Sequence, residues 1–424
     1  MPRENFSQEA HSDWKIVLYY SYINLSAGNK VDNQVEFHRE TCTNKDLKGR
    51  IRISPEGING VLSGRFDLLQ EYEQMVMQVL EEISEQKVDL NIKYCSLRED
   101  LPLEPQLFDS LIVRKTSTVI SLFGAEQVGE DRIHGKKLSK KAKAKRKQKK
   151  AQIEEALENE ESTGGIQWDK AKIQQDMVRL QPSPHLTPDE WNSRLLRAED
   201  NPDTSSALLL DVRNVYESRV GHFSAPNVPT LLTNTRKYSD LPELLANNPH
   251  IQEKQEIYMY CTGGVRCERV SVLVQSLYPD KRIYQLGGGI QTYLAAQVLH
   301  ITDGGIVQPP RSTNLFMGKN FVFDPRRTDP LHGPKAVIGK CLVCSKLHDD
   351  YDNGHAPSEL KEARCNTCRM LILVCNDCRP RYTCWGESSS SPQRPLLYCG
   401  LDQCVHEGAA PVPELVAPPT SLIK

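Results

Sequence analysis

Short apolar runs and amphipathic segments alternate along the first part of the chain. Four runs have the apolar or alternating pattern of β-strands: Trp14–Tyr20, Arg50–Ser54, Gly60–Gly64 and Leu90–Cys95. A short helix is predicted over residues 30–42, and a longer amphipathic helix begins at Asp67. The order βαββαβ predicts a ferredoxin-like (acylphosphatase-like) α+β domain, to which we assign residues 14–130.

A second pattern covers residues 183–302, where buried strands alternate with helices. Thr187, Pro188 and Glu190 have the residue types of an N-cap, N1 and N3 position, so a helix begins there. Strands follow at 208–213, 256–261 and 282–286, with a helix predicted between the last two. This alternation predicts a parallel α/β sheet flanked by helices, with ligands bound beyond the carboxyl ends of its strands.

Charge dominates the segment between these domains, residues 134–182. Ten of the fifteen residues at 136–150 are Lys or Arg, and an acidic stretch follows between Glu154 and Glu161. This composition cannot form a core, so we predict a charged, disordered or solvated helical linker. A plain spacer, a nuclear-import signal and an RNA-contacting arm are the alternatives for its basic part.

Bulk properties restrict the function classes. The chain has 424 residues, a net charge of −2, 38% hydrophobic residues and 25% charged residues, which fits a soluble multidomain protein. Nucleic-acid affinity must therefore come from local basic patches. No signal-peptide pattern and no run of about 18 apolar residues is present, so we expect a cytoplasmic protein with no membrane contact.

The strongest chemical signal follows the strand at 256–261. Its residues form a tight loop that leads directly into a helix: Cys261-Thr262-Gly263-Gly264-Val265-Arg266. Glycines allow the backbone N–H groups to turn inward, and the helix adds its partial positive charge, so we interpret the loop as an anion-binding cradle. Arg266 closes the loop and supplies a permanent cation. The alternative is a buried cysteine that follows a sheet strand.

This setting predicts a reactive thiolate at Cys261. Helix N-termini and neighbouring cations lower a cysteine pKa from about 8.5 to roughly 3.5–7.5. The loop is one residue shorter than that of cysteine phosphatases, and a smaller ring suits a single sulfur atom better than a phosphate. Sulfur chemistry, including a persulfide on Cys261, is therefore preferred over phosphate transfer.

Several neighbours have open roles. Asp211 and Arg213 end the strand that faces the site, and we expect either a charged pair that positions the loop or a rim salt bridge. Glu217 and His222 are either functional or structural. Cys267 is positioned either to resolve a Cys261 persulfide as a disulfide or, preferably, to pack into the helix.

The tail, residues 303–424, carries a second signal. Most of its cysteines occur in closely spaced pairs: Cys341, Cys344, Cys365, Cys368, Cys375, Cys378, Cys399 and Cys404. This spacing predicts two structural zinc sites with four thiolates each, and an iron–sulfur cluster is the alternative. The pairing is either consecutive or interleaved, with Cys384, His348, His355 and His406 as spare ligands. No nucleotide cofactor is indicated.

Specific residues resemble those of a known family. Asp211-Val212-Arg213, Glu217, Gly221-His222-Phe223 and the Cys261 loop are similar to the rhodanese family. The sequences Ser-Pro-Glu-Gly-Ile-Asn-Gly at 54–60 and Cys-Thr-Gly-Gly-Val-Arg-Cys-Glu at 261–268 resemble one branch of it. That branch contains the tRNA uridine hydroxylases, which form 5-hydroxyuridine at the wobble position. The cysteine-rich tail also fits this branch.

The resemblance implies a rhodanese-like domain at 183–302 and an enzyme that uses Cys261 in tRNA wobble-uridine modification. A tRNA and a small-molecule sulfur or oxygen donor are the implied partners, and no oligomeric state is implied. Two alternatives stay open. One is a persulfide sulfurtransferase that uses thiosulfate or another small donor, and the other is a non-catalytic, zinc-containing RNA-binding protein.

Overall fold

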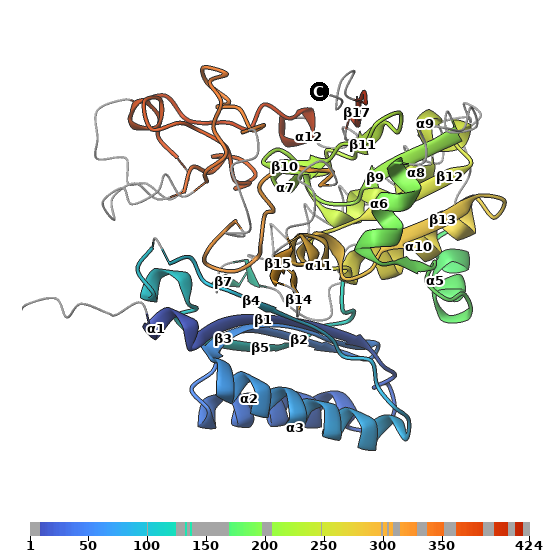
Figure 1. The fold of residues 1–424 in the computed structure, drawn as a ribbon, viewed down its shortest axis with the longest axis vertical. Helices are drawn as coiled ribbons and strands as arrows, with labels where there is room; N and C mark the ends of the chain where they lie inside the picture. The colour runs from blue at the N-terminus through green and yellow to red at the C-terminus, as the bar shows by residue number, and fades with distance from the viewer. Residues whose placement is uncertain are drawn as a thin grey trace, which may run out of the picture.

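The computed structural model is shown as a ribbon in Figure 1. It describes residues 9–99, 101–123, 132–133, 136–137, 169–196, 206–246, 248–297, 300–302, 305–307, 314–328, 337–351, 362–384, 394–405 and 412–418. The acidic stretch of the predicted linker and most of its basic run lie outside these residues. Among the described residues, no helix has both the length and the apolar character needed to cross a membrane.

The first domain is the predicted α+β sandwich with one additional strand. Its elements are α1 (Glu9–Ser12), β1 (Trp14–Tyr22), α2 (Lys30–Asn44), β2 (Lys48–Ser54), β3 (Gly57–Arg65), α3 (Phe66–Ser84), β4 (Asn91–Cys95), η1 (Glu104–Gln106) and β5 (Leu111–Lys115). The strands pair in the order β4-β1-β3-β2-β5. The sequence prediction does not include β5, which runs parallel to β2 at the edge of the sheet.

Helices α2 and α3 cover one face of this sheet, and the opposite face turns toward the second domain (Figure 1). The two faces follow from the alternation along β2. Ile51 and Ile53 are buried in the core under the helices, whereas Arg50 and Arg52, which alternate with them, are exposed on the other side. The sequence therefore places two arginines on the face toward the second domain.

The second domain has the predicted parallel sheet. Its strands are β8 (His185–Leu186), β9 (Ala207–Asp211), β11 (Thr230–Leu232), β12 (Glu256–Tyr260) and β13 (Arg282–Leu286), and β17 (Glu414–Val416) joins them. The order is β17-β11-β9-β12-β13-β8, and β17 pairs antiparallel to its neighbour at one edge. The neighbouring helices are α5 (Lys170–Arg179), α6 (Pro188–Leu196), α7 (Val215–Ser218), η4 (Tyr238–Asp240), α8 (Leu241–Ala246), α9 (Pro249–Glu253), α10 (Val265–Leu277) and α11 (Gly289–Ala296).

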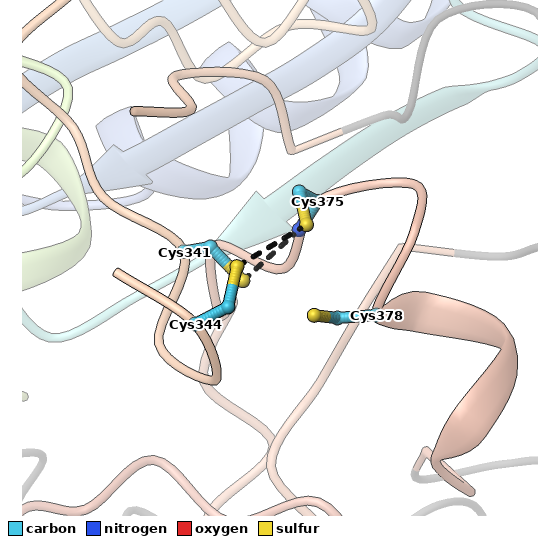
Figure 2. A group of neighbouring side chains, drawn as sticks. All are labelled: Cys341, Cys344, Cys375 and Cys378. Atoms are coloured by element: carbon cyan, nitrogen blue, oxygen red, sulfur yellow. Dashed lines mark hydrogen bonds between the residues drawn. The ribbon is translucent and has the colours of Figure 1, made fainter. Parts of the chain in front are cut away.

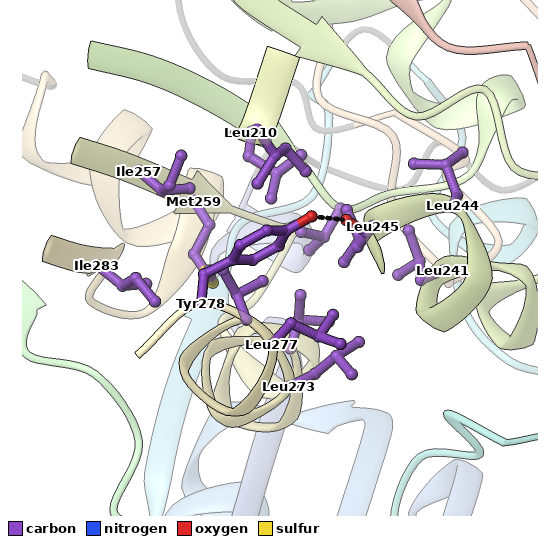
Figure 3. Close-up of a cluster of buried hydrophobic side chains, with 14 of the residues drawn as sticks. Leu210, Leu241, Leu244, Leu245, Ile257, Met259, Leu273, Leu277, Tyr278 and Ile283 are labelled. Carbon is purple, nitrogen blue, oxygen red and sulfur yellow. Dashed lines mark hydrogen bonds between the residues drawn. The ribbon is translucent and has the colours of Figure 1, made fainter. Parts of the chain in front are cut away.

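Side chains alternate between two cores on the two faces of this sheet. Leu210, Ile257 and Met259 point to one face, where they pack against α8 and α10 (Figure 3). Tyr278 closes this core, and its hydroxyl donates a hydrogen bond of 2.8 Å to the carbonyl oxygen of Leu245. On the opposite face, aromatic side chains form a second core: Trp191, Phe223, Tyr258, Tyr260, Tyr293 and Phe316. Burial on both faces fixes the carboxyl end of β12, where Cys261 follows.

Helix α5 lies inside the segment predicted to be a linker. Ile173 is buried, and Met177 packs against the same core one helical turn later. The helix contacts α10, where the Ser276 hydroxyl donates to Asp176 at 2.6 Å. These two apolar residues form a short stripe within a charge-rich segment. The average composition of the segment therefore does not predict that this helix packs against the second domain.

The tail is attached to the second domain at several points. It contributes β16 (Phe316–Gly318), which pairs with β10 (Gly221–Phe223), as well as β17. The Tyr351 hydroxyl donates to the carbonyl oxygen of Tyr216 at 2.6 Å. The remaining short elements are β6 (Arg132–Ile133), β7 (Lys136–Lys137), β14 (His300–Thr302), β15 (Gly305–Val307), η6 (Arg379–Arg381) and α12 (Asp402–Val405).

Candidate active site

The Cys261 loop has the strand–loop–helix geometry that the sequence predicts. β12 ends at Tyr260, and α10 begins at Val265 after Gly264, whose φ of 96° favours glycine. The Gly264 N–H donates to the Cys261 sulfur at 3.1 Å. The backbone therefore presents a donor directly to the sulfur atom.

A second glycine-containing turn supports this loop from behind. The N–H groups of Ile290 and Gln291 donate to the carbonyl oxygens of Cys261 and Thr262 at 2.9 and 3.0 Å. A Cβ atom on Gly289 would lie 2.6 Å from the Cys261 carbonyl oxygen, so only glycine allows this close approach. These bonds direct the loop carbonyls away from the sulfur and leave the N–H groups free to face it.

The surroundings of Cys261 stabilise its thiolate. Burial by itself raises the pKa of this thiol. The Cys267 thiol, the Arg266 charge and the N–H groups of both residues lower the pKa by more than burial raises it, to about 5. Burial and the Cys261 charge raise the pKa of Cys267 well above its ordinary value. At neutral pH the pair therefore consists of a Cys261 thiolate and a neutral Cys267 that donates to it.

Arg266 closes the loop through a buried carboxylate. Its two terminal nitrogens donate to the two oxygens of Glu217 at 2.6 Å each, and one of them also donates to the Thr262 hydroxyl at 3.1 Å. Both charged side chains are almost fully buried. Glu217 is held in α7, where its carboxylate accepts from the backbone N–H of Asn214 in a capping box. The Arg266 charge is therefore already paired with a carboxylate.

The Asp211–Arg213 pair lies inside the fold and not at the rim of the site. Both side chains are fully buried, and Arg213 donates to the two Asp211 oxygens at 2.9 and 2.7 Å. Arg213 also donates to the carbonyl oxygen of Gly221 at 2.5 Å, which ties β10 to the end of β9. His222 next to it contacts the Ser218 carbonyl oxygen at 3.2 Å, and burial lowers its pKa.

A cavity of about 350 Å³ lies between the two domains, next to the loop. Cys261 has no exposed surface, but its neighbours Thr262, Gly263, Val265 and Arg266 line the cavity. The sheet of the first domain forms the opposite wall. The residues of this wall are Leu18, Tyr19, Tyr20, Arg50, Arg52, Asn59, Gly60, Val61 and Lys93. The Asn59-Gly60 part of the predicted turn motif therefore lies opposite the Cys261 loop.

Hydrogen bonds between the domains hold this wall in place. The Tyr20 hydroxyl donates to Glu268 at 2.9 Å, and the Tyr22 hydroxyl donates to the Val265 carbonyl oxygen at 3.1 Å. Arg269 on α10 pairs with Glu56 at 2.6 Å. Since α10 begins at the Cys261 loop, the same helix borders the Cys261 sulfur and anchors the first domain.

The tail cysteines gather in two groups of four. Figure 2 shows the first group, Cys341, Cys344, Cys375 and Cys378, and the second comprises Cys365, Cys368, Cys399 and Cys404. Within each group the sulfur atoms lie within 4.8 Å of one another, so each group could hold a metal ion. The Cys341/Cys344 pair therefore joins the Cys375/Cys378 pair, and the Cys365/Cys368 pair joins Cys399 and Cys404. This arrangement is interleaved and not consecutive along the chain. Cys384 lies in neither group.

The two groups are built on matching turns. The N–H groups of Ser345 and Arg369 each donate at 2.9 Å to the carbonyl oxygen of the first cysteine in the pair, Cys341 or Cys365. Ser345 and Arg369 have positive φ values of 60° and 64°. In the first group, the Cys375 N–H also donates to the Cys341 sulfur at 3.3 Å. The donor set and the repeated geometry fit a four-thiolate metal site.

Two parts of the chain match known protein families. Residues 14–119 match a family described as UPF0176 acylphosphatase like domain. Residues 317–388 match a family described as Rhodanase C-terminal. The first match covers the sheet that forms one wall of the cavity, and the second covers six of the eight grouped cysteines.

Known proteins with similar sequences align with most of the chain. The Rhodanese-like domain-containing protein 6 of Arabidopsis thaliana is 29% identical over 373 residues, 88% of this chain and 52% of that protein. Two proteins named tRNA uridine(34) hydroxylase are each 27% identical. The Staphylococcus carnosus protein aligns over 87% of this chain and 87% of its own, and the Shouchella clausii protein over 90% and 94%. The chain therefore combines an acylphosphatase-like N-terminal region with a region similar to the Rhodanase C-terminal family, and a protein named rhodanese-like is among its relatives. The chain spans about half the length of the plant relative and most of the length of the two bacterial proteins.

Within this site, sequence reasoning identified the loop but missed most of the residues that face it. Glu217 was left undecided between function and structure, although it holds Arg266. Arg50, Arg52 and Phe323 of the cavity wall carry no local motif. The alternation of Arg50 and Arg52 with buried isoleucines was the available signal, since it places both arginines on one face of a strand.

Proposed function

We propose that this chain is an enzyme that modifies the wobble uridine of tRNA, uridine 34, by oxidation at the base, with the Cys261 thiolate as the reacting group. The observation that carries the proposal is the position of this thiolate. It lies in a donor-lined loop directly beside a cavity between the two domains. The names of the two bacterial relatives support the choice of substrate.

The cavity has the size expected for a single nucleotide. Its volume of about 350 Å³ is at the lower end of the range for small-ligand pockets. An enzyme that acts on a base must take the base out of its stack, and the single-stranded anticodon loop makes this easy. An extruded uridine therefore fits between the first domain and the Cys261 loop, whereas a helical segment of RNA does not.

The loop residues have distinct roles in this proposal. The N–H groups of Gly264, Arg266 and Cys267 stabilise the anion at the sulfur, either the thiolate or a species formed on it, and Thr262, Gly263 and Val265 complete the loop around it. Arg266 contributes its charge and closes the loop through Glu217. Asp211 and Arg213 position the loop from inside the fold, because they tie the end of β9 to β10. A small-molecule oxygen donor completes the reaction.

The two cysteine groups hold structural zinc ions. Four thiolates in a closed set are the ligands that zinc prefers at structural sites. The cysteines also form the centre of a small core with few aliphatic residues. Zinc binding therefore stabilises a part of the chain that hydrophobic burial alone supports weakly.

The test is to analyse tRNA nucleosides by mass spectrometry in cells that lack the endogenous protein. Wild-type protein restores the modification at uridine 34, and Cys261→Ser does not. The matched control is Cys42→Ala, because burial in the first domain raises the pKa of that thiol to about 12 and keeps it unreactive. If Cys261→Ser restores the modification as well as wild type, the proposal is wrong.

A persulfide sulfurtransferase is the second candidate, and the neighbouring cysteine favours it. The loop binds a single sulfur atom, and the neutral Cys267 thiol next to it donates a hydrogen bond that stabilises an anionic sulfur there. Mass spectrometry after treatment with thiosulfate distinguishes this candidate. It predicts an added sulfur atom on Cys261 in wild type and none in Cys261→Ser.

A further inference from the structure

Two arginines of the first domain face the Cys261 loop across the cavity. Arg50 and Arg52 lie two residues apart on β2, so their side chains leave the same face of the sheet. Both are exposed, and both line the cavity. The isoleucines on either side of Arg52 are buried under the helices and fix which face the arginines occupy.

The strand register extends this face across the sheet. Arg52 lies opposite Asn59 on β3, and Asn59 lies opposite Tyr20 on β1. One step along, Arg50 lies opposite Val61, and the row continues through Leu18 to Lys93 on β4. The wall opposite the loop therefore has an apolar and amide centre, with two arginines on one side and one lysine on the other.

The partners of Arg50 and Arg52 differ from those of Arg266. Among the described residues, no carboxylate forms an ion pair with Arg50 or Arg52, whereas Arg266 across the cavity is fully paired with Glu217. The pKa of the Arg52 guanidinium is lowered from its ordinary value by burial and then by the positive charges of Arg114 and Arg50. Like charges gathered next to a cavity favour an anionic ligand there.

An exposed aromatic ring lies at the edge of the same cavity. Phe323 is 39% exposed, although its neighbour Phe321 is buried. Its ring lies 5.4 Å from the Arg266 guanidinium and contacts Phe321 edge-on. An exposed ring beside cationic side chains is the usual combination for stacking a base of single-stranded nucleic acid.

A second groove shares this ring and continues the positive surface. Phe323 also lines a cavity of about 300 Å³ toward the tail, together with Arg236, Lys237 and Arg369. Two further arginines of this groove, Arg327 and Arg364, share the single carboxylate of Glu362. A small anion needs only one of these cavities. A strand of phosphodiesters uses both, because its backbone must continue past the nucleotide in the pocket.

We infer that Arg50 and Arg52 bind backbone phosphates of a single-stranded RNA segment, next to the nucleotide that faces the Cys261 loop, with Phe323 stacked on an adjacent base. This inference rests on the proposed function, since it assigns the part of the site that holds the RNA. It makes the first domain an RNA-binding wall as well as a cover for the loop.

The test measures binding of the full-length protein to an anticodon stem-loop RNA with uridine at position 34, over a range of salt concentrations. Arg50→Ala and Arg52→Ala each weaken binding about tenfold. Each also reduces the slope of log K against log salt by about 0.7, as loss of one contact to a single-stranded phosphate requires. Arg52→Lys keeps the charge and restores most of the slope.

Lys48→Ala is the matched control. Lys48 lies two residues before Arg50 on the same strand, pairs with Asp46 at 3.7 Å and does not line the cavity. This variant keeps the wild-type affinity and salt slope.

Three other outcomes overturn the inference in distinguishable ways. If wild type binds the RNA and both arginine variants bind equally well, the inference is wrong and the proposed function stands. If the variants bind RNA normally but lose modification, the arginines hold a small-molecule anion instead. If wild type does not bind the stem-loop, the proposed function fails together with the inference.

Discussion

Glu217 holds Arg266 through two hydrogen bonds of 2.6 Å each, and both side chains are almost fully buried. The pair connects two elements that are distant in the sequence, the short helix α7 and the loop after β12. The guanidinium is therefore fixed close to Cys261 while its own charge is balanced. This arrangement lets one cation stabilise a thiolate and close the loop without attracting a second anion into the fold.

Glu217→Gln tests this arrangement. The substitution leaves a buried guanidinium without its counter-charge, so we expect the free energy of unfolding to fall by about 3–5 kcal/mol. Urea unfolding monitored by circular dichroism measures the change. Glu190→Gln is the control, because that carboxylate caps an exposed helix start on α6. A decrease below about 1 kcal/mol for Glu217→Gln would show that the pair contributes little.

Cys267 should control the acidity of Cys261. Cys267→Ala removes the thiol that donates to Cys261, so the Cys261 pKa rises from about 5 by about one pH unit. Cys267→Ser provides a hydroxyl in the same place and keeps the pKa low. The measurement is the pH midpoint of thiolate absorbance at Cys261. Equal midpoints in the alanine and serine variants would contradict a hydrogen-bonding role for Cys267.

The pH dependence of stability has a predicted sign. The Cys261 pKa is about 5 in the folded chain and about 8.5 in an unfolded chain. Between these values the unfolded chain binds more protons at this thiol, so its contribution to the free energy of unfolding increases with pH. The contribution is complete above about pH 8.5 and is lost as pH falls through about 5.

Urea unfolding at several pH values checks this sign. The difference in unfolding free energy between wild type and Cys261→Ser should increase from acidic to mildly alkaline pH. Both proteins share the remaining titratable groups, so their effects cancel in the difference. A difference that stays constant with pH would mean that Cys261 is not ionised in the folded state.

Because the two cysteine groups are separate, we expect a substitution in one group to remove the zinc ion of that group alone. Purified wild-type protein should contain two zinc ions per chain, one for each cysteine group. Cys365→Ser removes a ligand of the second group and reduces the content to one. Cys384→Ser is the control, since Cys384 is buried in the same core but belongs to neither group. Elemental analysis measures both, and two ions in the Cys365→Ser protein would contradict the assignment.

The parts of the fold that sequence predicted well are local. The strand, the glycine turn and the helix around Cys261 lie within a few residues of one another, and so do the strands and helices of the first domain. The alternation of apolar residues fixed these elements directly. The exception, β5, pairs at the sheet edge after a long connection and has only a short apolar run.

The parts that sequence missed depend on contacts between distant segments. Residue spacing cannot show that Cys344 meets Cys375, or that Cys368 meets Cys399, since both pairs are 31 positions apart and consecutive pairing was equally consistent. Nothing local shows that Glu217 reaches Arg266, 49 positions away. Arg50 and Arg52 become part of a site only after α10 anchors the first domain over the loop.

The central claim is that Cys261 is a thiolate at neutral pH, and a direct titration tests it. The difference in ultraviolet absorbance between wild type and Cys261→Ser isolates this thiol from the other cysteines. We expect a single transition with a midpoint near pH 5. A midpoint near the ordinary cysteine value of about 8.5 would contradict the account of the site and the proposed function built on it.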